Sequence, residues 1–184
     1  MGLIHHHRGD NDPNRYIMKE RLLAFATDFY IENSAGLRCY WVDGKALRVR
    51  ETLLFREPNG VELYKVQQRK VRLRDTMKIE DPSGHTVATV KKHLITPIHQ
   101  RFDIRFETEQ EMHAKGNILA HEYKITREGH EIAHISKKWV RIRDTYAVQV
   151  TEGANVPLVL AITSAIDTMA DPGRSCGRGC RVSA

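Results

Sequence analysis

Two matched pairs of arginines are the residues whose type and spacing point most directly to ligand chemistry. Arg72 and Arg74 lie in the stretch VRLR, and Arg141 and Arg143 lie in the stretch VRIR. Successive side chains of a β-strand point to opposite faces, so apolar residues alternating with basic ones place both arginines of a pair on the face away from the core. A planar guanidinium binds phosphate or carboxylate through two parallel hydrogen bonds. The pattern predicts an anion-binding outer surface.

Two lysine pairs extend this prediction. In Lys91-Lys92 and Lys137-Lys138 only one lysine of each pair can share an outer face, because adjacent strand residues point in opposite directions. We expect Lys91 and Lys138 to point outward, and Lys92 and Lys137 to reach out from strand ends along their apolar stems. The predicted residues for anion or lipid binding are therefore Arg72, Arg74, Lys91, Lys138, Arg141 and Arg143.

These basic residues also have structural interpretations. Charged side chains keep a sheet surface soluble and protect exposed strand edges. Both arginine pairs are followed by an aspartate, Asp75 or Asp144, so the guanidinium groups could instead hold the turn at the strand end. The net charge is +6 over 184 residues, which permits an anionic partner without requiring one.

Other residue types capable of chemistry give weaker signals. The run His5–His7 is a weak metal site at most, and whether it is native or a tag remnant stays open. Cys176 and Cys180 have no further ligands near them in sequence, and whether they form a pair also stays open. We found no glycine-rich phosphate loop, nucleophile elbow or paired carboxylates in an apolar setting. The sequence therefore predicts a protein that is not an enzyme and has no metal or cofactor.

An internal repeat indicates which elements position the basic residues. Residues 60–79 and 129–148 align without a gap, and both contain VR-x-RDT. Weaker copies begin at Gly36 and Gly84. In all four copies the sixth residue after the glycine is Val or Ile. A turn glycine followed by a strand with an apolar residue at fixed depth is typical of a β-hairpin. Repeated hairpins predict a meandering antiparallel sheet that closes on itself.

The segment 156–170 differs from the rest of the chain. It is apolar nearly all round, has a proline in its first turn, and is shorter than the roughly 20 residues that cross a membrane. It is therefore expected to be a helix buried inside the closed sheet. Residues 1–14 and 171–184 are polar and are expected to be flexible tails, which leaves residues 15–170 as one domain.

Several ordered motifs resemble one known family. They are RYIMKERLL at 15–23, VDGKA at 42–46, VATVKK at 87–92, GN-x-x-x-HEY at 116–123, ISKKW at 135–139 and DTY at 144–146. Together they are similar to the LURP-one-related family, whose fold resembles the tubby C-terminal domain and the phospholipid scramblases. The resemblance implies a mainly β fold, a closed antiparallel barrel of about twelve strands around a central hydrophobic C-terminal helix.

The resemblance leaves the function open, since one fold hosts many functions. Tubby-like domains bind phosphoinositides, so it implies a non-enzymatic module that docks peripherally on anionic membrane lipids or another phosphorylated ligand. The alternative is a structural or protein-interaction domain with no lipid ligand, whose partner the sequence does not identify. Nucleic acid is a less favoured partner that is not ruled out. Without an apolar run typical of a signal peptide, we expect a cytoplasmic protein, peripheral at the membrane if it binds lipid.

Overall fold

The computed structural model describes residues 12–19, 29–44, 52–68, 76–94, 100–140 and 145–170. Across these residues the chain forms twelve strands followed by one helix. The strands are β1 (Arg15–Lys19), β2 (Phe29–Asn33), β3 (Arg38–Gly44), β4 (Thr52–Arg56), β5 (Glu62–Gln68), β6 (Thr76–Glu80), β7 (Thr86–Leu94), β8 (Gln100–Phe106), β9 (Glu111–Asn117), β10 (Glu122–Arg127), β11 (His130–Ser136) and β12 (Thr145–Val150). The helix is α1 (Val156–Ala170).

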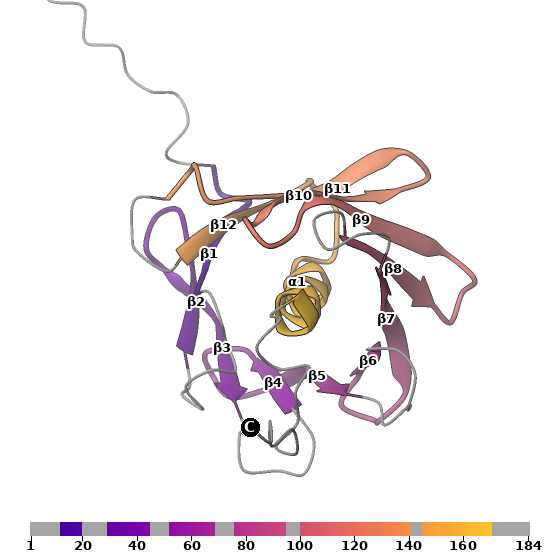
Figure 1. Cartoon of the computed structure of the whole chain (residues 1–184). Coiled ribbons are helices and arrows are strands. Elements are labelled where there is room, and N and C mark those ends of the chain that lie inside the picture. The colour runs from indigo at the N-terminus through magenta and orange to yellow at the C-terminus, as the bar shows by residue number, and fades with distance from the viewer. Residues whose placement is uncertain are drawn as a thin grey trace, which may run out of the picture.

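The strands form a closed antiparallel barrel around the helix (Figure 1). Each strand pairs with its neighbours in the chain, and the first strand closes the ring by pairing with the last. In that closing pair Arg15 lies opposite Gln149 and Lys19 lies opposite Thr145. The predicted mainly β barrel around a C-terminal helix is confirmed. Among the described strands, closure leaves no open sheet edge on which another chain could add a strand.

The predicted hairpin repeat corresponds to a repeated turn. Gly36, Gly60, Gly84 and Gly129 all have positive φ, at 76°, 92°, 89° and 82°. In each hairpin the strand pairing then shifts by one residue close to the turn. This is the turn-plus-bulge geometry that needs a residue in the left-handed region. The sixth residues after these glycines are completely buried, namely Val42, Val66, Val90 and Ile135.

Helix α1 fills the barrel, and its residues from Val159 to Ala170 are all buried. Its buried hydroxyl groups are satisfied locally. The hydroxyls of Thr163, Ser164 and Thr168 donate to backbone carbonyls four residues earlier, at 2.8–2.9 Å. A hydroxyl bonded in this way can be buried without a partner from another element. The helix therefore lies within a closed apolar interior despite its Thr and Ser residues.

The two ends of α1 are capped differently. At the start, the Asn155 side-chain oxygen accepts a hydrogen bond from the Leu158 backbone N–H at 3.1 Å. At the end, the Lys92 ammonium donates to the Met169 carbonyl at 2.7 Å. The expectation that Lys92 reaches outward was wrong. Lys92 alternates with Lys91 and so faces the interior, where the carbonyls at the helix C-terminus attract a cation.

The segment just before β1 is tied to the barrel wall. One Asp12 carboxylate oxygen accepts a hydrogen bond from Gln149 Nε2 at 2.7 Å. The Asp12 carbonyl accepts from Ser34 Oγ at 2.8 Å, and the Asn14 carbonyl accepts from the Val150 backbone N–H at 2.9 Å. These contacts link the start of the described chain to β12 and to the β2–β3 turn.

Candidate functional site: a basic outer face

The described structure covers only part of the predicted basic surface. Arg72, Arg74, Arg141 and Arg143 lie outside the described residues. Lys91 lies on β7, and Lys138 follows β11. In the barrel order β8, β9 and β10 separate these two strands, so the two lysines do not meet in one patch.

Lys138 is exposed, as expected, and has a partner. Its side chain is 80% exposed, and its ammonium lies 3.6 Å from a Glu122 carboxylate oxygen. The other Glu122 oxygen accepts hydrogen bonds from Ser136 Oγ at 2.8 Å and from the Lys137 backbone N–H at 3.1 Å. Burial raises the pKa of Glu122, but these bonds and the Lys138 charge outweigh it, so the net shift is downward. Glu122 therefore organises the turn after β11, and Lys138 belongs to that turn.

Lys91 lies among other basic residues. The outward faces of β7, β8 and β9 carry eight charged or titratable side chains. Two of them, Arg105 and Glu111, form an ion pair with each other, and the other six lie at adjacent positions in the register. Strand pairing places Lys91 opposite Asp103, His93 opposite Arg101, Asp103 opposite His113, and Arg101 opposite Lys115. We call this group the β7–β9 patch, and it comprises Lys91, His93, Arg101, Asp103, His113 and Lys115.

Asp103 is the centre of the patch. One of its carboxylate oxygens lies 2.8 Å from His93 Nε2. The other lies 2.9 Å from both Arg101 Nε and His113 Nδ1. Burial raises the pKa of Asp103, but hydrogen bonds from His113 and Arg101 and the nearby positive charges shift it below its usual value overall. Asp103 is therefore a stable anion that fixes Arg101 and orients two imidazole rings on the surface.

Two lysines flank this centre without a counter-charge. Among the residues that the structure describes, neither Lys91 nor Lys115 has a carboxylate within ion-pair distance. Lysines on nearby strands differ in this respect, since Lys65 pairs with Glu80 at 2.6 Å and Lys124 pairs with Glu131 at 2.7 Å. The patch thus has three permanent cations around one carboxylate, and its two histidines add positive charge when protonated.

Most of this patch was missed by the sequence analysis. The five missed residues alternate with apolar or inward residues, so the period of two could have placed them on the outer face. They are His93, Arg101, Asp103, His113 and Lys115. Their convergence depends on the register of three strands, which the sequence pattern does not fix.

In the described part of the chain, no group of three or more His, Cys, Asp or Glu side chains is arranged to hold a metal ion. Within the same residues, no helix combines the length and the apolar character needed to cross a membrane. His121 lies in the β9–β10 turn, where its φ is 50°.

The fold and the basic face define a class of protein: a twelve-stranded barrel closed around its own C-terminal helix, with a cationic patch on its wall. The chain belongs to the LURP-one-related family, whose family model matches residues 14–167. The matched region runs from the residue before β1 into the last turn of α1. No curated protein matches the chain.

Proposed function

We propose that this protein is a non-enzymatic binding module that docks on anionic phospholipid headgroups, or on another phosphorylated ligand, through its outer basic surface. In the described residues that surface is the β7–β9 patch. Docking would be peripheral, with the barrel remaining folded on the membrane surface. The arginines at positions 72, 74, 141 and 143 are candidates to extend it, as the sequence pattern predicts.

The observation that supports this proposal is the pair of uncompensated lysines beside a fixed arginine. In an ion pair the charge of a lysine is balanced by a carboxylate of the protein. The charges of Lys91 and Lys115 are not balanced in this way and are available to a ligand. Arg101 is held in place by Asp103, so less conformational entropy is lost when a phosphate binds it. Basic residues near an anionic membrane surface contribute about 1 kcal/mol each to binding.

The test is co-sedimentation with vesicles of phosphatidylcholine alone, with added phosphatidylserine, and with added phosphoinositide, at two salt concentrations. We expect the wild-type protein to bind only the anionic vesicles and to bind them less at high salt. The Lys91→Gln/Lys115→Gln variant should bind roughly thirtyfold more weakly, from about 1 kcal/mol per cation. Soluble inositol phosphate added as a competitor distinguishes recognition of the headgroup from general attraction to the membrane.

The matched control is Arg38→Gln/Lys65→Gln, which removes the same two charges from β3 and β5. Both residues are already paired, Arg38 with Glu32 at 3.9 Å and Lys65 with Glu80 at 2.6 Å. The control should bind nearly as well as the wild type. If the wild type fails to bind every anionic vesicle at low salt, the lipid proposal is wrong. The alternative of a structural or protein-interaction domain would then be favoured.

A further inference from the structure

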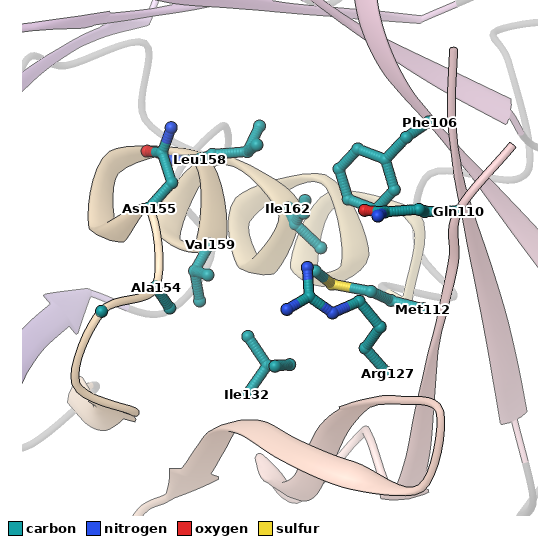
Figure 2. Close-up of a pocket in the computed structure, with 11 residues that line it drawn as sticks. Phe106, Gln110, Met112, Arg127, Ile132, Ala154, Asn155, Leu158, Val159 and Ile162 are labelled. Atoms are coloured by element: carbon teal, nitrogen blue, oxygen red, sulfur yellow. The ribbon is translucent and has the colours of Figure 1, made fainter. Parts of the chain in front are cut away.

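A second candidate site lies at the end of the barrel where α1 begins. A cavity of about 330 Å³ lies there between the helix, the β8–β9 hairpin and the β10–β11 hairpin (Figure 2). Its walls are largely apolar and include Met112, Ile132, Val159 and Ile162. The volume is at the lower end of the range for small-molecule sites. The cavity shares no residue with the β7–β9 patch.

One cation reaches into this apolar space. Arg127 is the last residue of β10, two positions after the buried Ile125, and Figure 2 shows its guanidinium directed between Ile132 and Ile162. The Arg127 side chain is exposed, so the cavity is open to solvent there. Within the described residues Arg127 has no ion pair, and none of the eleven lining residues is acidic.

The start of the helix adds to this electrostatic bias. The N-terminus of α1 adjoins the cavity through Asn155 and Leu158, and its first turn has no acidic residue. A helix N-terminus carries partial positive charge that favours anions. Two positive groups therefore flank one apolar cavity without a carboxylate among the lining residues, an arrangement that an anionic group would stabilise.

We propose that this cavity binds a single-chain amphiphile with an anionic head, such as a medium-chain fatty acid. The carboxylate would pair with the Arg127 guanidinium at the opening, where planar groups can form two parallel hydrogen bonds. The alkyl chain would lie along Met112, Ile132, Val159 and Ile162, replacing water at an apolar wall. The cavity volume suits one short chain better than a two-chain phospholipid.

The test is isothermal titration calorimetry of the full chain with decanoate and with decanol, below the concentration at which decanoate forms micelles. Decanoate should bind with one-to-one stoichiometry and more tightly than decanol. Arg127→Gln should weaken decanoate binding about tenfold or more, the loss typical of a hydrogen bond to a charged group. The same substitution should leave decanol binding nearly unchanged, because the alcohol carries no charge.

Two further variants locate the binding. Arg105→Gln removes the same charge from the outer face of neighbouring β8, where Arg105 pairs with Glu111 at 2.8 Å, and should bind decanoate like the wild type. Ala154→Leu places a larger side chain in the cavity and should abolish binding of both ligands, with thermal unfolding confirming that it folds. If that variant fails to fold, Arg127→Glu, at an exposed position, should abolish decanoate binding alone.

Three results would overturn the proposal. The first is no saturable binding of decanoate by the wild type. The second is an equal loss for Arg127→Gln and Arg105→Gln, which would indicate general charge attraction. The third is full decanoate binding by a folded Ala154→Leu variant, which would place the ligand elsewhere. None of these outcomes depends on vesicle binding, so this proposal and that for the β7–β9 patch can fail separately.

Discussion

Asp167 shows how a charged residue is accommodated deep inside the barrel. It lies on α1 with only 9% of its surface exposed, and one of its carboxylate oxygens is 3.5 Å from His121 Nε2. The His121 ring in turn stacks on Tyr146, with ring centroids 4.3 Å apart. The positive φ of His121 lets the short β9–β10 turn direct this ring back toward the helix. A buried acid is tolerated when such polar neighbours surround it.

Tyr123 belongs to the same buried region and gives a pH-dependent prediction. Burial, and then the negative charge of Asp167, raise the pKa of Tyr123 well above its usual value. The pKa of Tyr123 is higher in the folded state than in the unfolded state, where it is near 10. Its contribution to the free energy of unfolding is therefore complete below about pH 10 and is lost as the pH rises toward the folded-state pKa. From pH 8 to pH 11 the wild type should lose about 1.4 kcal/mol more than Tyr123→Phe.

Urea unfolding of both proteins at a series of pH values measures this difference. The remaining tyrosines are common to both proteins, so their titration cancels in the comparison. They include Tyr40, whose pKa is raised to about 12 by burial and by nearby groups. Parallel stability curves for the two proteins above pH 10 would contradict the assignment. The sequence did not reveal the turn that holds His121, because turns without glycine carry little local signal, and it offered no reason to associate Tyr123 with Asp167.

At the scale of elements, the hairpin is the unit that the sequence predicted best. A turn glycine and an apolar residue six positions later are local features, and local sequence alone determines the turn and bulge geometry. The helix was predicted equally well, because a nearly continuous apolar run after a proline differs from the pattern of the strands. What local pattern could not predict is how the strand lysines meet the helix. Lys91 and Lys92 are adjacent in sequence, yet one lies on the outer surface and the other caps α1.

The cap predicts different effects for these two neighbours. Lys92→Met should lower the free energy of unfolding by about 1 kcal/mol, because it removes a cation from the carbonyl end of a buried helix. Lys91→Met removes the same charge from the outer face and should change stability by less than about 0.5 kcal/mol. Chemical denaturation of both variants at one pH checks this. Equal losses would mean that the bond to Met169 has no special role in stability.

At the scale of the whole molecule, the barrel and the helix depend on each other. Among the described elements, α1 is the one that lies inside the sheet, and all its residues from Val159 onward are buried. The sequence predicted this relation from the all-round apolar run and from the repeated hairpins. The pairing that closes the ring, between β1 and β12, joins segments more than a hundred residues apart. The sequence pointed to it through the general argument that closure removes sheet edges and through the family resemblance, and not through any local pattern.

The mutual dependence predicts that a charge on the helix prevents folding of the entire domain. Leu160 is completely buried and does not line the cavity at the barrel end, so an aspartate there would be cut off from solvent. Leu160→Asp combines the loss of a buried leucine, about 2–5 kcal/mol, with the burial of an unpaired charge. That sum approaches the total stability of a typical domain, about 5–15 kcal/mol.

The control is Leu119→Asp in the β9–β10 turn, where the leucine is 47% exposed and the same substitution should be tolerated. Circular dichroism and thermal unfolding should show that Leu160→Asp has lost its cooperative transition, whereas Leu119→Asp keeps it. A Leu160→Asp protein that melts like the wild type would mean that the helix is not the core of the barrel.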